Sequence, residues 1–134
     1  MNPSKLNFIV IDDSKLDCFI AEKIIRNTGR SESIKSFLHA TDALEFIKNN
    51  TQDTSEFKTI LMVDIQMPIM NGFDFVEAFD KLENVNRENF IIYVLSSSIN
   101  ENDLNRVRYL SSVIQFLNKP LTSNTLSALL DMIN

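Results

Sequence analysis

Short apolar runs alternate along this chain with segments whose apolar residues recur at helical spacing. The runs Leu6 to Ile11, Thr59 to Val63 and Phe90 to Leu95 are apolar over most of their length, as expected for strands buried on both faces of a sheet. Val113 to Leu117 predicts a further strand, and the alternating segment Ser33 to Leu38 predicts an edge strand. We therefore expect five strands.

The segments that follow the strands predict helices. The first helix is expected to begin near Lys15, where Ser14 and Asp17 are placed as a capping pair, and to end near Gly29. Its apolar face is predicted to consist of Leu16, Phe19, Ile20 and Ile24.

Four more helices are predicted downstream. They are marked by Ala40, Ala43, Leu44 and Ile47, by Phe75, Ala78, Phe79 and Leu82, by the segment from the N-cap Asn100 to about Leu110, and by Leu126, Leu129, Leu130 and Ile133 at the chain end. The polar segment Asn49 to Glu56 is predicted to be a loop. The helix after Asn100 has a thin apolar stripe of Leu104 and Val107, so we expect it to be loosely packed and exposed.

Alternation of strands and helices favours a parallel sheet with right-handed helical crossovers. Five such units fit an α/β, doubly wound, flavodoxin-like fold with strand order 2-1-3-4-5. A length of 134 residues suits one domain, and 44% apolar residues is ordinary for a globular chain. We expect one domain over residues 1–134, with no output domain.

Charge and cysteine content restrict the class of protein. The net charge of −5 argues against direct nucleic-acid binding, which normally needs a basic patch. The sequence has no apolar run long enough to span a bilayer and no apolar signal segment near Met1. The lone Cys18 excludes an internal disulfide and a zinc cluster. These features predict a cytoplasmic protein without membrane association.

Polar residues stand directly after four of the predicted strands. They are Asp12, Asp13, Asp64, Ser96 and Lys119. The carboxyl ends of parallel strands share one edge of the sheet, where such folds hold their ligands. Three carboxylates and one lysine there carry a net charge of −2, which one Mg²⁺ ion would neutralise.

This set of side chains suits phosphoryl transfer. An aspartate can be the nucleophile that forms an aspartyl phosphate, and Asp64 is the better candidate because it stands alone after a central strand. Lys119 can pair with phosphoryl oxygens, and the Ser96 hydroxyl can donate a hydrogen bond to one of them.

The same stretches resemble the receiver domains of two-component response regulators. The resemblance is carried by Ile11-Asp12-Asp13-Ser14, by the loop from Val63-Asp64 through Met67-Pro68 to Asn71-Gly72, by Leu95-Ser96-Ser97 and by Lys119-Pro120. It spans essentially the whole chain and is closest to single-domain, chemotaxis-regulator-like receivers. Serine at 96 and phenylalanine at 116 replace the commoner threonine and tyrosine.

The resemblance implies roles for individual residues. Asp13 would bind Mg²⁺ directly, Asp12 more often through water, and the main-chain carbonyl of Gln66 would complete the metal ligands together with Asp64. Ser96 and Phe116 would form the switch.

The resemblance also implies partners. A sensor histidine kinase or a histidine phosphotransfer protein would donate the phosphoryl group, and a small phosphodonor such as acetyl phosphate could also serve. The protein would catalyse its own phosphorylation and slow dephosphorylation, which leaves its description as an enzyme open. The fourth helix, fifth strand and fifth helix would form the face that binds a downstream protein target, whose identity the sequence leaves open.

Three alternative functions fit the sequence to different degrees. A phosphatase of the haloacid dehalogenase type carries an acid/base two residues after its nucleophile, where this chain has Gln66. A flavin-binding protein would place a phosphate loop after the first strand, where Asp12 and Asp13 would repel it. A receiver-like scaffold that binds partners without being phosphorylated stays the main alternative.

Overall fold

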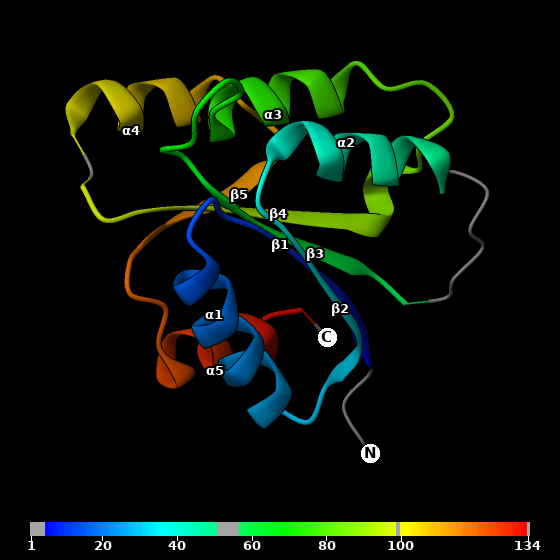
Figure 1. The fold of residues 1–134 in the computed structure, drawn as a ribbon, viewed down its shortest axis with the longest axis vertical. Coiled ribbons are helices and arrows are strands. Elements are labelled where there is room, and N and C mark those ends of the chain that lie inside the picture. Colours follow the sequence, from blue (N-terminus) through cyan, green and yellow to red (C-terminus); the bar gives the residue numbers. More distant parts are fainter. Residues whose placement is uncertain (1–4, 51–56, 99, 134) are drawn as a thin grey trace.

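The computed structural model describes residues 5–50, 57–98 and 100–133, and shows one five-stranded parallel sheet with helices on both faces (Figure 1). The strand order is β2-β1-β3-β4-β5, as the sequence predicts. The strands are β1 (Leu6–Ile11), β2 (Ser31–Phe37), β3 (Thr59–Asp64), β4 (Phe90–Ser96) and β5 (Val113–Asn118). The helices are α1 (Lys15–Asn27), α2 (Ala40–Asn49), α3 (Gly72–Asp80), α4 (Glu101–Arg108) and α5 (Ser123–Asp131), with a short 3-10 helix η1 (Arg87–Asn89) before β4.

The two faces of the sheet support separate apolar clusters. Helices α1 and α5 cover one face, and α2, α3 and α4 lie on the other (Figure 1). Because side chains alternate along a strand, β1 sends Phe8 and Val10 to the first cluster and Ile9 and Ile11 to the second. Strand β3 is central in the sheet and buried over its whole length, and the phosphoacceptor candidate Asp64 is its last residue.

Most element boundaries lie within one or two residues of the predictions. Strand β2 begins and ends earlier than expected, at Ser31–Phe37, and α2 extends through Asn49. The rest of the loop predicted between Asn49 and Glu56 falls largely on residues 51–56, outside the described residues. Asn100 caps α4 through its side chain, as predicted, by accepting a hydrogen bond from Asp103 N.

The predicted apolar face of α1 is wrong for Leu16, Phe19 and Ile20, and is confirmed only for Ile24, which is half-buried against the first cluster. Leu16 and Phe19 are 66% and 62% exposed, and Ile20 is also exposed. The helix instead buries Cys18, Ala21 and Ile25, which have the same helical spacing on a neighbouring stripe. Small side chains at 18 and 21 let the helix approach the sheet closely, so the bulkier residues remain outside.

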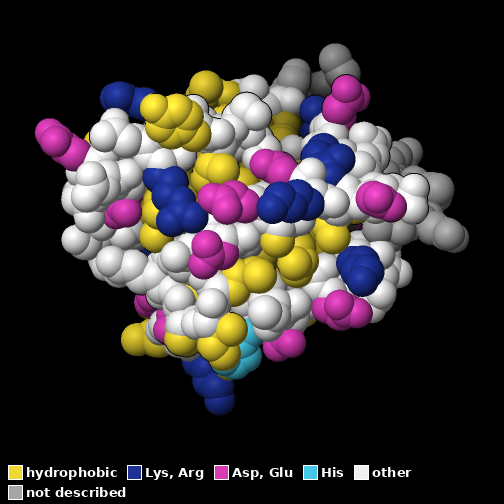
Figure 2. All heavy atoms as spheres, turned by 90° about the horizontal axis from the view of Figure 1, so that it is seen from above, with side chains coloured by type: hydrophobic (Ala, Val, Ile, Leu, Met, Phe, Trp, Pro, Cys, Tyr) yellow, Lys and Arg dark blue, Asp and Glu magenta, His cyan; other side chains and the backbone are white. Residues whose placement is uncertain are grey.

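Helix α4 has the thin contact that its sequence predicts, because none of its residues from Glu101 to Arg108 is buried. Val107 is half-buried against the second cluster. Arg106 joins the helix to α3 through Glu77, with Nη2 3.0 Å from Oε1, and through Asp74. Acidic and basic side chains lie interspersed over this face of the molecule (Figure 2), so it carries no patch of one sign.

Candidate functional site

The acidic candidates meet at the carboxyl edge of the sheet because β1 and β3 are neighbours. Ile11 pairs with Val63, which brings the next residues, Asp12 and Asp64, to the same edge. Both carboxylates are buried, whereas Asp13 is exposed. Oxygen atoms from Asp12, Asp13 and Asp64 all lie within 4.8 Å of one another.

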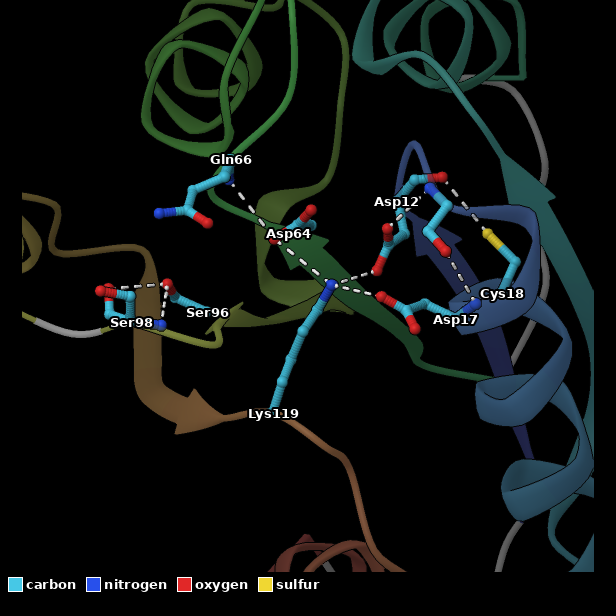
Figure 3. Close-up of polar contacts among 9 residues, drawn as sticks. Asp12, Asp17, Cys18, Asp64, Gln66, Ser96, Ser98 and Lys119 are labelled. Carbon is cyan, nitrogen blue, oxygen red and sulfur yellow. Dashed lines mark hydrogen bonds and ion pairs between the residues drawn. The ribbon is translucent and has the colours of Figure 1, made fainter.

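Lys119 reaches this acidic group from the end of β5 (Figure 3). Its Nζ donates to Asp12 Oδ2 at 2.6 Å and to Asp17 Oδ2 at 3.0 Å, and lies 3.5 Å from Asp64 Oδ1. The ammonium group is therefore surrounded by three carboxylates, from the loop after β1, from α1 and from the end of β3. A lysine side chain only 16% exposed is compatible with the fold because it is paired in this way.

Burial and charge shift the ionisation of the site. Burial, with repulsion from Asp12, raises the pKa of Asp64 to about 6, although Lys119 acts in the opposite direction. Burial alone would lower the pKa of Lys119, but its hydrogen bonds to Asp12 and Asp17 raise it above the ordinary value. Burial, followed by the charge of Asp12, raises the pKa of the Cys18 thiol to about 11, so this cysteine is not a thiolate at neutral pH.

The acidic group fits a hard divalent cation. Clustered carboxylate oxygens are the ligands that Mg²⁺ prefers, and the three carboxylates beside the single ammonium group of Lys119 leave negative charge for a cation to offset. The backbone N–H of Gln66 donates to Asp64 Oδ1 at 3.3 Å and so helps to orient that carboxylate. The predicted role of the Gln66 carbonyl as a metal ligand stays a prediction.

The backbone around Asp64 is held by the start of α3. Asn71 and Asp74 form a reciprocal capping box at the start of α3. At Gly72, an added Cβ would lie 2.7 Å from the carbonyl oxygen of Asp64 and 2.9 Å from Ile65 Cα. Only glycine fits at position 72. This explains why glycine occupies the second position of the Asn71-Gly72 pair, which is part of the resemblance to receiver domains.

Ser96 is fully buried at the end of β4, but its hydroxyl is turned away from Asp64 (Figure 3). The Oγ donates to the carbonyl of Ser98 at 2.9 Å and accepts from the backbone N–H of Ser98 at 3.1 Å. A hydrogen bond to a group on Asp64 would require this side chain or its loop to move. Phe116 lies on β5 opposite Val94 of β4 and is half-buried against the second cluster.

Asp17 is the site residue that sequence reasoning missed. Its backbone N–H does donate to Ser14 Oγ at 3.2 Å, so half of the predicted capping pair is present. The Asp17 carboxylate, however, binds Lys119, and the N–H of Ser14 donates to Asp12 Oδ1. The available signal was its place in the first turn of the helix that follows Asp12, where a side chain can face back toward the edge of the sheet.

A cavity of about 300 Å³ opens beside these residues. Its polar lining includes Asp12, Asp17, Asp64 and Lys119, and its apolar lining includes Ile20 and Leu121. Asp13 and Ser96 lie outside the lining.

In the described part of the chain, no helix is long and apolar enough to cross a membrane.

Comparison with known families agrees with this geometry. The profile of the response regulator receiver domain matches residues 8–131. The chain belongs to this family. The match confirms the resemblance found in the sequence, and the observed strand order confirms the predicted fold.

Solved structures support the same assignment. A response regulator receiver protein from Dyadobacter fermentans is 30% identical, with a TM-score of 0.83 over 95% of this chain and 96% of that one. A two-component response regulator from Cytophaga hutchinsonii is 27% identical, with a TM-score of 0.86 over 97% of each chain. The receiver domain of the histidine kinase CKI1 from Arabidopsis thaliana, solved with Mg²⁺, shares the fold at 19% identity and a TM-score of 0.81 over 98% and 94% of the chains. A comparison with curated proteins finds no match.

Proposed function

We propose that this receiver domain accepts a phosphoryl group on Asp64 in a Mg²⁺-dependent reaction. The observation that carries the proposal is the meeting of Asp12, Asp13, Asp64 and Lys119 at one edge of the sheet. The donor would be the phosphohistidine of a sensor histidine kinase or a histidine phosphotransfer protein. Residues 1–134 would act as one domain, a regulator or relay that works through binding of other proteins.

In this reaction a carboxylate oxygen of Asp64 attacks phosphorus. A P–O bond forms, the P–N bond of the phosphohistidine breaks, and its electron pair leaves with the imidazole. Lys119, already within 3.5 Å of Asp64, would pair with a phosphoryl oxygen, and the Ser96 hydroxyl would donate to another after leaving Ser98. The domain would thereby catalyse its own phosphorylation and slow dephosphorylation.

Bound Mg²⁺ would neutralise charge that develops on the phosphoryl oxygens. The exposed Asp13 is suited to bind it directly. Asp12 is already occupied by Lys119, so it would bind the ion more often through water. Asp64 and the main-chain carbonyl of Gln66 would supply the other protein ligands.

A protein donor is supported by the outer face of α1. Leu16, Phe19 and Ile20 are exposed apolar residues within one turn of each other, and Ile20 also lines the cavity beside Asp64. Exposed apolar groups next to a reactive pocket are typical of a protein contact surface. A kinase or phosphotransfer protein could use these side chains to align its histidine, and we propose the cytoplasm as the compartment in which the two proteins meet.

Phosphorylation can be tested with acetyl phosphate and intact-mass analysis. Wild type with Mg²⁺ should gain the mass of one phosphoryl group, whereas Asp64→Asn should gain none. Removal of Mg²⁺ with EDTA should abolish the gain, and Asp13→Asn should raise the Mg²⁺ concentration that is needed. Asp42→Asn, which alters an exposed acid of α2, is the matched control and should behave as wild type.

Two results would contradict the proposal. Equal modification of wild type and Asp64→Asn would place the phosphoryl group elsewhere. No modification of wild type by acetyl phosphate or by any phosphohistidine donor, together with no binding of Mg²⁺, would favour the receiver-like scaffold that works without phosphorylation.

For output, we propose that α4, β5 and α5 form the face that switches. Tyr109, Ile114 and Met132 are exposed apolar residues there. Ile114 and Met132 also line a hollow of about 270 Å³ between β5 and α5. The backbone N–H of Lys119 donates to the carbonyl of Ser96 at 2.9 Å, which joins the ends of β4 and β5. A phosphoryl group that binds Ser96 and Lys119 would therefore shift the end of β5, the strand that carries Phe116. Because Phe116 has no hydroxyl group, it would respond through packing and not through a hydrogen bond.

This switch can be tested by NMR with beryllofluoride, a stable mimic of the phosphoryl group. Chemical shifts should change in the Asp64 pocket and also over residues 96–120. Changes confined to the pocket would mean that Ser96 and Phe116 do not transmit the signal.

A further inference from the structure

We infer that Asp17 is a positioning residue that holds Lys119 toward α1 and so limits how strongly the site binds a phosphoryl group. The inference rests on the proposed function, because it concerns the lysine that would pair with the phosphoryl oxygens. Asp17 would touch neither the metal nor the phosphoryl group. It would act only through Lys119.

The geometry of Lys119 shows where it is held. Nζ donates to Asp17 Oδ2 at 3.0 Å and to Asp12 Oδ2 at 2.6 Å, both within hydrogen-bond distance, whereas Asp64 Oδ1 is 3.5 Å away. Figure 3 shows the lysine lying between Asp64 on one side and the two other carboxylates on the other. The ammonium group therefore donates hydrogen bonds to Asp12 and Asp17, and it lies beside the phosphoacceptor candidate Asp64 without a hydrogen bond to it.

Asp17 differs from Asp12 in what the metal would do to it. Asp12 belongs to the three-carboxylate group that could share one cation, and a bound cation would weaken its attraction for Lys119. Among the described residues Asp17 is outside that group, so its attraction for Lys119 would persist when the metal is bound. With Mg²⁺ present, Asp17 is therefore the carboxylate that competes with a phosphoryl group for the lysine.

The competition is also reversible. The Asp17 side chain is 42% exposed, so water can solvate its carboxylate when Lys119 turns away. The loss of this contact opposes the phosphorylated state, but only moderately. Replacing Asp17 with asparagine keeps the shape and removes the charge, so the Lys119 contact weakens and the phosphorylated state gains.

The expected effect is tighter binding of beryllofluoride at saturating Mg²⁺. For a charged hydrogen bond that is partly exposed, roughly a two- to tenfold decrease in the apparent Kd is reasonable. A residue with a merely structural role would weaken binding when replaced, so the sign of the change is diagnostic. Phosphorylation by acetyl phosphate should also reach a higher steady-state level in Asp17→Asn.

The experiment compares five proteins by NMR titration with beryllofluoride: wild type, Asp17→Asn, Glu22→Gln, Lys119→Met and the double variant that combines Asp17→Asn with Lys119→Met. Glu22 is the matched control, because it lies on the same helix and its carboxylate binds Arg26 and Ser36. Glu22→Gln makes the same change in charge without touching Lys119, so its affinity should equal that of wild type. Thermal unfolding checks that each protein is folded.

A double-mutant cycle decides whether Asp17 acts through the lysine. In the Lys119→Met background, adding Asp17→Asn should leave the residual affinity unchanged. If the gain persists there, or if Glu22→Gln gives the same gain, the effect is general electrostatics and the inference is wrong. Unchanged or weaker binding by Asp17→Asn would also overturn it. Failure of wild type to bind beryllofluoride at all would instead count against the proposed function.

Discussion

At the carboxyl edge of the sheet, the loops after β1 and β3 lead into helices with buried faces, whereas the helix after β4 has no buried residue. Helix α3 buries Phe73, Phe75, Val76 and Phe79, and its first residue, Gly72, lies against the backbone of Asp64. Helix α4 contacts the body through the half-buried Val107 and through Arg106, whose guanidinium lies 4.7 Å from the centre of the Phe73 ring.

The difference follows the tasks that we propose for the two regions. Carboxylates that must hold a cation and a phosphoryl group in register need a backbone that cannot shift, and buried contacts supply it. An element that changes position when a distant group is modified must come from the less stable part of the fold. Substitutions in the frame around Asp64 and in α4 test this difference separately.

The largest expected effect comes from the buried charge of Asp64. The folded pKa of about 6 lies above the ordinary 3.8, so the folded state binds this proton more tightly than the unfolded state. The stability that results is present below pH 4 and is lost as pH rises through about 6. Without Mg²⁺ at pH 7, Asp64→Asn should therefore be more stable than wild type by about 3 kcal/mol.

Urea unfolding between pH 4 and 8, with EDTA and with Mg²⁺, measures this difference. Mg²⁺ should reduce the stability difference between Asp64→Asn and wild type. The ion stabilises the charged form of Asp64 in the wild-type protein, whereas the variant lacks this carboxylate ligand. Asp42→Asn is the control and should follow the wild-type curve. A stability difference that does not depend on pH or on Mg²⁺ would show that burial of charge at Asp64 is not the cause.

The next effect concerns the frame around Asp64. In Gly72→Ala, the new Cβ would lie under 3.0 Å from two backbone atoms that cannot turn away, so unfolding should become easier by about 2 kcal/mol. Gly29→Ala is an instructive control, because nothing lies within 4 Å of its added Cβ and the cost there, about 1 kcal/mol, comes from a φ of +72°. Only Gly72→Ala should also slow phosphorylation by acetyl phosphate. Equal activity of the two variants would mean that the position of Asp64 does not depend on Gly72.

The sequence predicted best where one strong pattern decides the structure. Continuous apolar runs located β1, β3 and β4, and the polar residue after each run located the site, because the carboxyl ends of parallel strands must share an edge. The thin apolar stripe of Leu104 and Val107 also predicted correctly that α4 is loosely packed, because none of its residues is buried.

Prediction failed where two patterns of equal period competed. Helix α1 carries a bulky stripe with Leu16 and Phe19 and a smaller stripe with Cys18 and Ala21, and hydrophobicity alone favoured the bulky one. The structure buries the smaller stripe, since close packing on the sheet depends on side-chain size. The role of Asp17 was missed because a helix cap explained it locally, whereas its partner Lys119 is 102 residues away in the sequence.

The smallest expected effect is on α4, and it tests the other side of the contrast. Arg106 is the polar link between α4 and α3, with ion pairs to Asp74 and Glu77 and a cation–π contact with Phe73. Its side chain is 42% exposed, so Arg106→Gln should change global stability by less than about 1 kcal/mol. The local effect should be larger, because few buried contacts remain to hold the helix. Amide hydrogen exchange should become several-fold faster from Leu104 to Arg108 while β3 and α3 stay protected. Arg108→Gln, whose guanidinium contacts only Asn105 of its own helix among the described residues, is the control. If exchange in α4 is the same in both variants, Arg106 does not hold the helix, and its resting position depends on Val107 and Leu110 instead.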